Sequence, residues 1–295
     1  MTSEGCYVAR RPPRHESIEV RGLVHRVTRW GPVQAPPVVL LHGFLDTGET
    51  WQFLVDELPQ SWAFAAPDWR GFGASEWASD GYWFQDYFAD LEVLLDELSP
   101  GAPARVIGHS MGGNVASLYA GVRPARLEWL VNLEGFGLRQ TDAREAPGRL
   151  GQWLDQLRTP PSAPHYDSVD ALAQRLLERN PRLTAQRAAF IARAWTRPAG
   201  QGVMLRHDPR HRRVNPVLYR REEAQACWRA ASVRTLLLVG EHSDSRRRLG
   251  EDGTDAALRM TFPAARVQQM AGLGHMMHHE DPAALATAIT AFAAA

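Results

Sequence analysis

A serine at a predicted strand-to-helix junction limits the folds open to this chain more than any other feature. Residues 105–121 read RVIGHSMGGNVASLYAG, in which residues 104–110 predict a strand and residues 112–122 a helix. Gly108-His109-Ser110-Met111-Gly112 fits G-x-S-x-G, a turn so tight that flanking side chains would collide with neighbouring backbone. The turn lifts the serine hydroxyl above the sheet edge, and the helix amides favour negative charge there. The alternative is a flexible glycine-serine turn, but the strand and helix on either side favour a catalytic serine.

The chain alternates between apolar runs and segments with apolar residues at helical spacing. Residues 17–31 predict an opening hairpin, and residues 282–294 a closing helix with Pro282 in its first turn. Buried strands are predicted at 36–44, 64–73, 104–110, 127–137 and 234–244, and further helices at 83–98 and 112–122. This alternation indicates crossover units, so the predicted fold class is α/β with a mostly parallel central sheet flanked by helices.

Residues 138–231 interrupt the alternation. They carry three amphipathic helical patterns separated by proline-rich turns, and no strand-like run intervenes before Leu236. We therefore expect a core formed by residues 1–137 and 232–295, with residues 138–231 inserted as a helical cap, or lid.

Composition excludes several partner classes. The 295 residues include 33 basic and 33 acidic side chains, so net charge favours neither nucleic acid nor a membrane surface as partner. The first twenty residues have no apolar segment typical of a signal peptide, and no run reaches the length of a transmembrane helix. Cys6 and Cys227 are far apart and are expected to be free thiols. We expect a cytoplasmic protein whose oligomeric state the sequence leaves open, with a homodimer as one option.

Three further motifs accompany the serine turn. They are LLHGF at 40–44, PDWRGFGAS at 67–75 and GLGHMMHHEDP at 272–282. With these motifs in this order, nearly the whole chain resembles the α/β-hydrolase superfamily, in its serine-nucleophile branch with a helical cap. The resemblance implies an α/β-hydrolase fold, an oxyanion loop at 40–44 and a histidine loop near the C-terminus.

The serine needs a base, and His275 is the candidate because it follows the nucleophile in chain order, in a loop before the last helix. Two carboxylates compete for the role of orienting it. Asp244 follows the strand where most relatives carry the acid, although it is offset by one residue from the usual spacing. Glu134 ends the strand after the nucleophile, as in the haloalkane dehalogenase-like branch. We favour Asp244 over Glu134 at this stage and keep both.

The remaining site predictions follow from the resemblance and the motif. The backbone amides of Phe44 and Met111 are expected to form the oxyanion hole, and His42 to orient the oxyanion loop. The HMMHH run at 275–279 is not expected to bind metal, because no matching carboxylate-and-histidine set recurs at ligand spacing.

These parts predict acyl chemistry. The expected function is a serine hydrolase that cleaves a carboxylic ester or related acyl bond of a small molecule through an acyl-enzyme, with no cofactor and no metal. Two alternatives stay open: a non-catalytic ligand-binding protein on the same scaffold, or a cofactor-free acyltransferase, perhydrolase or C–C hydrolase.

Overall fold

A computed structural model describes residues 7–295, so Cys6, one of the two predicted free thiols, lies outside the described residues. The centre is an eight-stranded sheet in the order β1-β2-β4-β3-β5-β6-β10-β11. Its strands are β1 (Arg14–Val20), β2 (Leu23–Trp30), β3 (Pro37–Leu41), β4 (Ala63–Pro67), β5 (Ala104–His109), β6 (Leu127–Leu133), β10 (Thr235–Gly240) and β11 (Ala265–Met270). The first two strands form the predicted antiparallel hairpin, and all pairings from β4 to β11 are parallel. The predicted fold class is confirmed.

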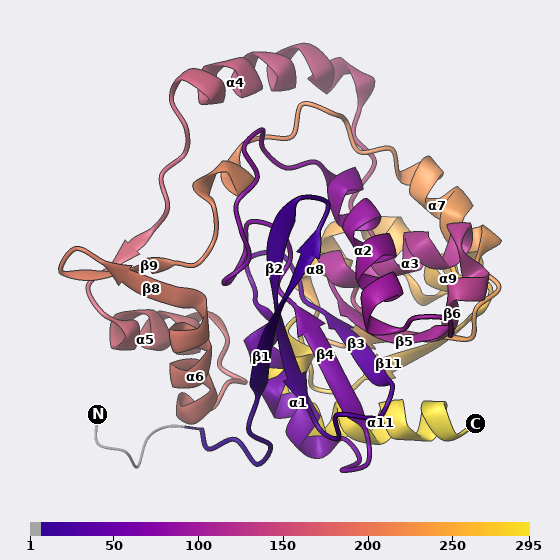
Figure 1. The fold of residues 1–295 in the computed structure, drawn as a ribbon. Helices are drawn as coiled ribbons and strands as arrows, with labels where there is room; N and C mark the ends of the chain where they lie inside the picture. The colour runs from indigo at the N-terminus through magenta and orange to yellow at the C-terminus, as the bar shows by residue number, and fades with distance from the viewer. Residues whose placement is uncertain (1–6) are drawn as a thin grey trace.

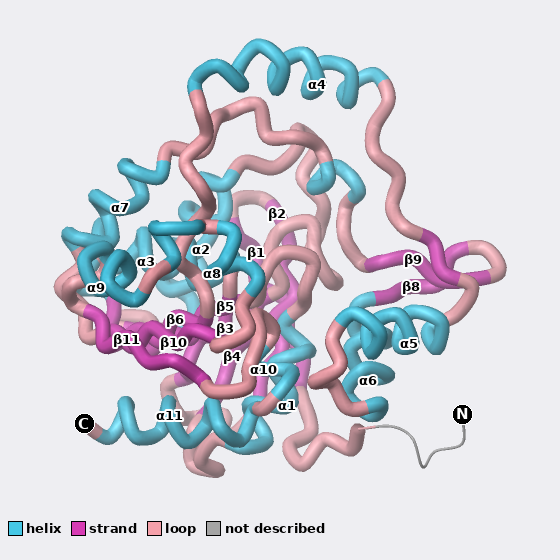
Figure 2. Tube along the Cα trace, turned by 180° about the vertical axis from the view of Figure 1, so that it is seen from behind, coloured by secondary structure: helices cyan, strands magenta, loops and turns pink. Residues whose placement is uncertain are grey.

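Helices cover both faces of this sheet (Figures 1 and 2). One face packs against α1 (Gln52–Glu57) and α11 (Pro282–Ala294), and the other against α2 (Phe84–Leu98) and α3 (Met111–Val122). The central strands β3, β4 and β10 are buried along their whole length. Strands buried on both faces explain why these segments read as continuous apolar runs in the sequence.

Residues 138–231 hold the three predicted helices, α4 (Ala146–Arg158), α5 (Val169–Arg179) and α6 (Ala185–Trp195). They also hold a small antiparallel sheet of β7 (His165–Tyr166), β8 (Thr196–Ala199) and β9 (Gly202–Leu205), so the expectation that no strand intervenes is wrong. These strands span two to four residues, too few to give a recognisable alternation. The helix α4 arches over one end of the molecule, apart from the other elements, and has no buried residue (Figure 1).

The last helix of this region, α7 (Arg221–Ala230), packs with the core. Its Trp228 is buried in a cluster with Leu237 and Val239 of β10 and with Leu258 of α9 (Asp255–Thr261). The domain limits stay a prediction, but the side chains of α7 pack with the central sheet.

Short elements join these parts. They are η2 (Gly48–Trp51), η3 (Pro124–Arg126), η4 (Ala143–Glu145), η5 (Pro209–Arg212), α8 (Asp244–Arg248), η6 (Gly250–Gly253) and α10 (Met277–Glu280). Of the helices in residues 7–295, none combines the length and the apolar character that crossing a bilayer requires.

Candidate active site

The candidate residues gather where the parallel strands end. Ser110 follows β5, Glu134 follows β6 and His275 follows β11, each directly or within one loop. A backbone hydrogen bond aligns the ends of the neighbouring strands β5 and β6: the Ser110 N–H donates to the Leu133 carbonyl at 2.8 Å. Ligand sites of open α/β sheets form at this edge because the loops leaving adjacent strands diverge there.

The turn at Ser110 has the strained geometry that its sequence predicts. Ser110 has φ 49° and ψ −111°, a left-handed conformation that is uncommon for a residue with a side chain. A Cβ on Gly112 would lie 2.2 Å from the Leu41 carbonyl oxygen, and one on Gly108 would lie 2.7 Å from that of Gly112. Glycine at both positions is therefore a packing requirement, because the elbow touches the end of β3.

The structure brings Ser110, His275 and Glu134 into one hydrogen-bonded series. The Ser110 Oγ lies 3.1 Å from His275 Nε2, and His275 Nδ1 lies 3.1 Å from Glu134 Oε2. A carboxylate can only accept, so the imidazole donates from Nδ1 and offers the Nε2 lone pair to the serine hydroxyl. The Glu134 side chain is fully buried, whereas that of His275 is 26% exposed. This tautomer is the one that a base for Ser110 requires.

Two residues that sequence reasoning missed hold Glu134 in place. The Gly240 N–H donates to Glu134 Oε1 at 2.7 Å, and the Ser243 hydroxyl donates to Oε2. Glu134 has φ 61°, and the Asn132 side chain closes the turn around it with 2.7 Å hydrogen bonds to the N–H and C=O of Gly135. No local motif marks Gly240 and Ser243 as partners of Glu134, because they lie 106 and 109 residues away from it in the sequence.

Asp244, the acid favoured from the sequence, has a different hydrogen-bond partner. It opens the helix α8, its side chain is 67% exposed, and it pairs with Arg247 one turn later. Ser243, the residue before it, points inward and caps this helix by accepting from the Arg246 N–H at 3.0 Å. The sequence-based preference is therefore corrected: of the two carboxylates, Glu134 is the one hydrogen-bonded to His275.

The two predicted oxyanion donors flank the serine turn. Met111 is the first residue of α3, so its N–H has no acceptor within the helix. Phe44 follows His42-Gly43 after β3, the residue is 49% exposed, and its ring packs edge-on against that of Phe72 at a centroid distance of 5.7 Å. The next residue, Leu45, has φ 63°, another left-handed position beside the site.

His42 fixes this loop from beneath. Its Nδ1 donates to the Gly43 carbonyl at 2.7 Å, and its Nε2 accepts from the Trp69 N–H at 2.9 Å. Burial lowers the pKa of His42 to about 4, so its ring is neutral at pH 7. The neutral ring can donate and accept at once, which ties β3 to the turn that follows β4.

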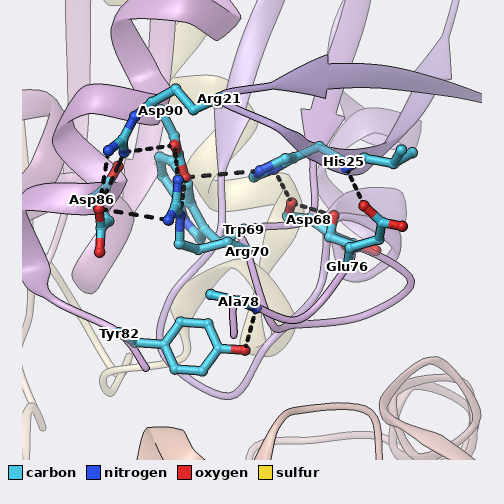
Figure 3. Close-up of polar contacts among 12 residues, drawn as sticks. Arg21, His25, Asp68, Trp69, Arg70, Glu76, Ala78, Tyr82, Asp86 and Asp90 are labelled. Carbon is cyan, nitrogen blue, oxygen red and sulfur yellow. Dashed lines mark hydrogen bonds and ion pairs between the residues drawn. The ribbon is translucent and has the colours of Figure 1, made fainter. Parts of the chain in front are cut away.

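Asp68 and Arg70 brace that turn by hydrogen bonds (Figure 3). Asp68 accepts backbone N–H groups of Gly48 at 2.6 Å and Ala74 at 2.9 Å, and burial raises its pKa to about 6. Arg70 binds Asp90 of α2 with a 2.5 Å contact from Nε. His25 lies between Asp68 and Asp90 and donates from Nδ1 to the Asp68 carbonyl at 3.0 Å (Figure 3). These contacts anchor the loop without reaching Ser110.

A cavity of about 240 Å³ opens beside His275. Its apolar lining comes from Leu176, Leu183, Ile191, Trp195 and Met276, and its polar lining includes Arg179, Arg182, His242 and Asp244. Helices α5 and α6 supply one wall and the loop of His275 the other. The cavity gives space for a small organic group next to the histidine.

Comparisons with known proteins identify a family for this chain. The family model described as the alpha/beta hydrolase fold matches residues 36–282. The chain belongs to the α/β hydrolase family. A serine hydrolase-like protein of Danio rerio is 27% identical over 289 residues, covering 93% of this chain and 85% of the relative. The lipase LipV of Mycobacterium tuberculosis is 39% identical over 109 residues, 37% of this chain and 40% of the relative.

Solved structures of α/β hydrolases have the same fold as this chain. The thioesterase domain from the curacin biosynthetic pathway superposes with a TM-score of 0.81 at 26% identity, covering 95% of this chain and 99% of that domain. Family membership and the relatives' names support a hydrolase.

Proposed function

We propose that this α/β hydrolase cleaves a carboxylic ester or related acyl bond, with Ser110 as nucleophile, His275 as general base and Glu134 as the triad acid. The observation that carries the proposal is the pair of 3.1 Å contacts that join Ser110 to His275 and His275 to Glu134. The strained elbow and the buried, hydrogen-bonded carboxylate add support, since both keep the three groups aligned before substrate arrives.

The proposed reaction begins when Ser110 Oγ bonds to the substrate's carbonyl carbon while its proton passes to His275 Nε2. The carbonyl oxygen becomes an oxyanion, which accepts hydrogen bonds from the N–H groups of Phe44 and Met111. Glu134 stabilises the imidazolium without taking its proton. His275 then protonates the leaving alcohol or thiol, and an acyl-Ser110 ester remains.

Water completes the cycle by the same steps. It loses a proton to His275 as its oxygen bonds to the acyl carbon, and the second tetrahedral intermediate collapses to a carboxylic acid and free Ser110. None of these steps uses a cofactor.

The cavity beside His275, lined by apolar and by charged side chains, has room for a compact substrate group. Its volume of about 240 Å³ lies just below the usual range of ligand pockets, and five of its lining side chains are apolar. We therefore propose short acyl esters and thioesters as the first substrates to test. The thioesterase domain that superposes on this chain is the reason to include thioesters.

A fluorophosphonate probe tests the proposal directly. Wild-type protein should be labelled at Ser110 and should hydrolyse some members of a panel of esters and thioesters of graded chain length. Ser110→Ala should lose both labelling and turnover. A protein that labels no more than Ser110→Ala would instead be a ligand-binding member of the family. Hydrogen peroxide, alcohols or a C–C substrate, added to the same two proteins, test the perhydrolase, acyltransferase and C–C hydrolase alternatives.

A further inference from the structure

A second group of ionisable side chains lies beneath the proposed triad. Asp46 follows β3, His109 ends β5 and His278 belongs to α10, and all three are at least 98% buried. One ligand-type atom from each lies within 4.8 Å of the others. The proposed reaction uses none of these side chains, so their burial together needs another explanation.

One oxygen of Asp46 is occupied and the other faces imidazoles. Its Oδ1 accepts three hydrogen bonds, from the Thr47 N–H, the Thr50 hydroxyl and the Trp195 indole. Its Oδ2 accepts a hydrogen bond from His278 Nε2 at 3.3 Å and lies 3.6 Å from His279 Nε2. The carboxylate is thus held in place by one oxygen and directs the other into the histidine group.

His109 has the arrangement of a histidine ligand. Its Nε2 lies 2.9 Å from the His275 carbonyl oxygen, which can only accept, so this nitrogen carries the proton. Its Nδ1 therefore holds a lone pair, and among the described residues that buried atom has no hydrogen-bond partner. Histidines that bind metals commonly donate their other N–H to a carbonyl or carboxylate in this way.

Two more imidazole rings lie beside that of His109. The ring of His278 lies 4.3 Å from that of His109 and 3.9 Å from that of His279, measured between centroids. Within residues 7–295, His278 Nδ1 is also buried without a hydrogen-bond partner. An unpaired buried polar atom costs roughly 1–3 kcal/mol, so the free lone pair of His109 Nδ1 destabilises the fold unless something binds there.

We propose that Asp46, His109 and His278 form a binding site for a divalent transition metal ion of the zinc type. Two imidazole nitrogens and one carboxylate oxygen are donors that Zn²⁺ accepts. Ligand atoms around tetrahedral Zn²⁺ lie about 3.3 Å apart, and Asp46 and His278 already have this spacing. The ligand atom of His109 lies within 4.8 Å of both, so it has to approach by at most roughly 1.5 Å. His279 is the candidate fourth ligand. From the sequence, the 275–279 run was not expected to bind metal; the proposal departs from that expectation because Asp46 and His109 come from distant segments.

Occupancy would act on the triad through His109. A metal held at Nδ1 restrains the ring whose Nε2–H binds the His275 carbonyl, and so it restrains the backbone of the proposed base. The site is distinct from the triad itself, because the His275 ring binds Ser110 and Glu134.

Cobalt and zinc titrations of the full-length, chelator-treated protein test the site. We expect one Co²⁺ per chain with visible absorption of a four-coordinate ion, displaced by Zn²⁺, and a Zn²⁺-dependent rise in Tm. Asp46→Asn preserves the shape of the carboxylate and His278→Gln removes one imidazole; each should weaken binding about 100-fold or more. His207→Gln removes another buried histidine, distant in sequence from the group, and should bind as wild type does.

Two further measurements keep the outcome decisive. His275→Ala should retain Co²⁺ binding, which separates this site from adventitious binding at the triad. Circular dichroism in chelator should show that the variants fold; if Asp46→Asn does not, His278→Gln and the wild-type cobalt spectrum decide. The proposal is overturned if wild type binds no stoichiometric Co²⁺, if folded variants of Asp46 and His278 bind unchanged, or if His275→Ala abolishes binding.

Discussion

The Ser243 hydroxyl donates a hydrogen bond to Oε2 of Glu134, the same oxygen that His275 Nδ1 approaches at 3.1 Å. The loop after β10, where the resemblance implied the acid, here supplies a hydrogen-bond donor to a carboxylate that follows β6. Two strand ends thus cooperate in holding one carboxylate. This relationship leads to distinct expectations for Glu134, Asp244 and Ser243.

Exchanging each carboxylate for its amide separates the two acids. Glu134→Gln should lower kcat by on the order of 10⁴, because the amide no longer stabilises the imidazolium and can present its NH₂ to His275. Asp244→Asn should stay within a few-fold of wild type, since its carboxylate pairs with Arg247 in solvent. Steady-state kinetics on the best ester of the panel measures both. A large loss in Asp244→Asn with little in Glu134→Gln would reverse the assignment.

Removing the Ser243 hydroxyl should have an intermediate effect. Ser243→Ala deletes one of the hydrogen bonds that fix Glu134 and also the cap of α8, so we expect kcat to fall about tenfold and stability by about 1 kcal/mol. Ser243→Thr keeps a hydroxyl in both roles and should recover most of the activity. Equal loss in both variants would mean that the hydroxyl does not position the carboxylate.

The sequence predicted those parts of the site that depend on local geometry. Gly108, Ser110 and Gly112 predict a tight strand-to-helix turn because the residues that form it lie within a few positions of one another in the sequence. His275 was found from chain order, since it follows the last strand. The central strands β3, β4 and β10 were predictable because each is a continuous apolar run.

What the sequence could not decide depends on how distant segments meet. The choice between Glu134 and Asp244 turns on whether the end of β6 or of β10 faces His275, and their spacings were compatible with either. The grouping of Asp46 with His109 and His278 is likewise a tertiary property. The strands β8 and β9 were missed because each spans four residues, too few to give a recognisable alternation.

The elbow glycine makes a prediction about stability. Gly112→Ala places a Cβ against the main chain at the end of β3, 2.2 Å from the Leu41 carbonyl oxygen, and should destabilise the protein by about 3 kcal/mol. Gly151→Ala is the matched control, because it lies within α4 with no atom within 4 Å of the added Cβ. It should leave stability unchanged or raise it by up to about 1 kcal/mol. Urea unfolding measures both, and similar values for the two would contradict the contact.

His211 should make stability depend on pH. Its ring stacks between Phe72, at a centroid distance of 3.9 Å, and Tyr82, at 3.6 Å, and burial lowers its pKa from 6.5 to about 3. The unfolded chain binds a proton that the folded one excludes, so this contribution to stability is complete above pH 6.5 and is lost as pH falls from 6.5 towards 3. Between pH 6 and 4, His211→Phe should reduce the slope of unfolding free energy against pH by about 1.4 kcal/mol per unit. A residual slope is expected from His207, whose pKa burial lowers to about 4. Urea titrations at several pH values measure the slopes, and parallel curves for wild type and His211→Phe would show that His211 is not shielded from protonation.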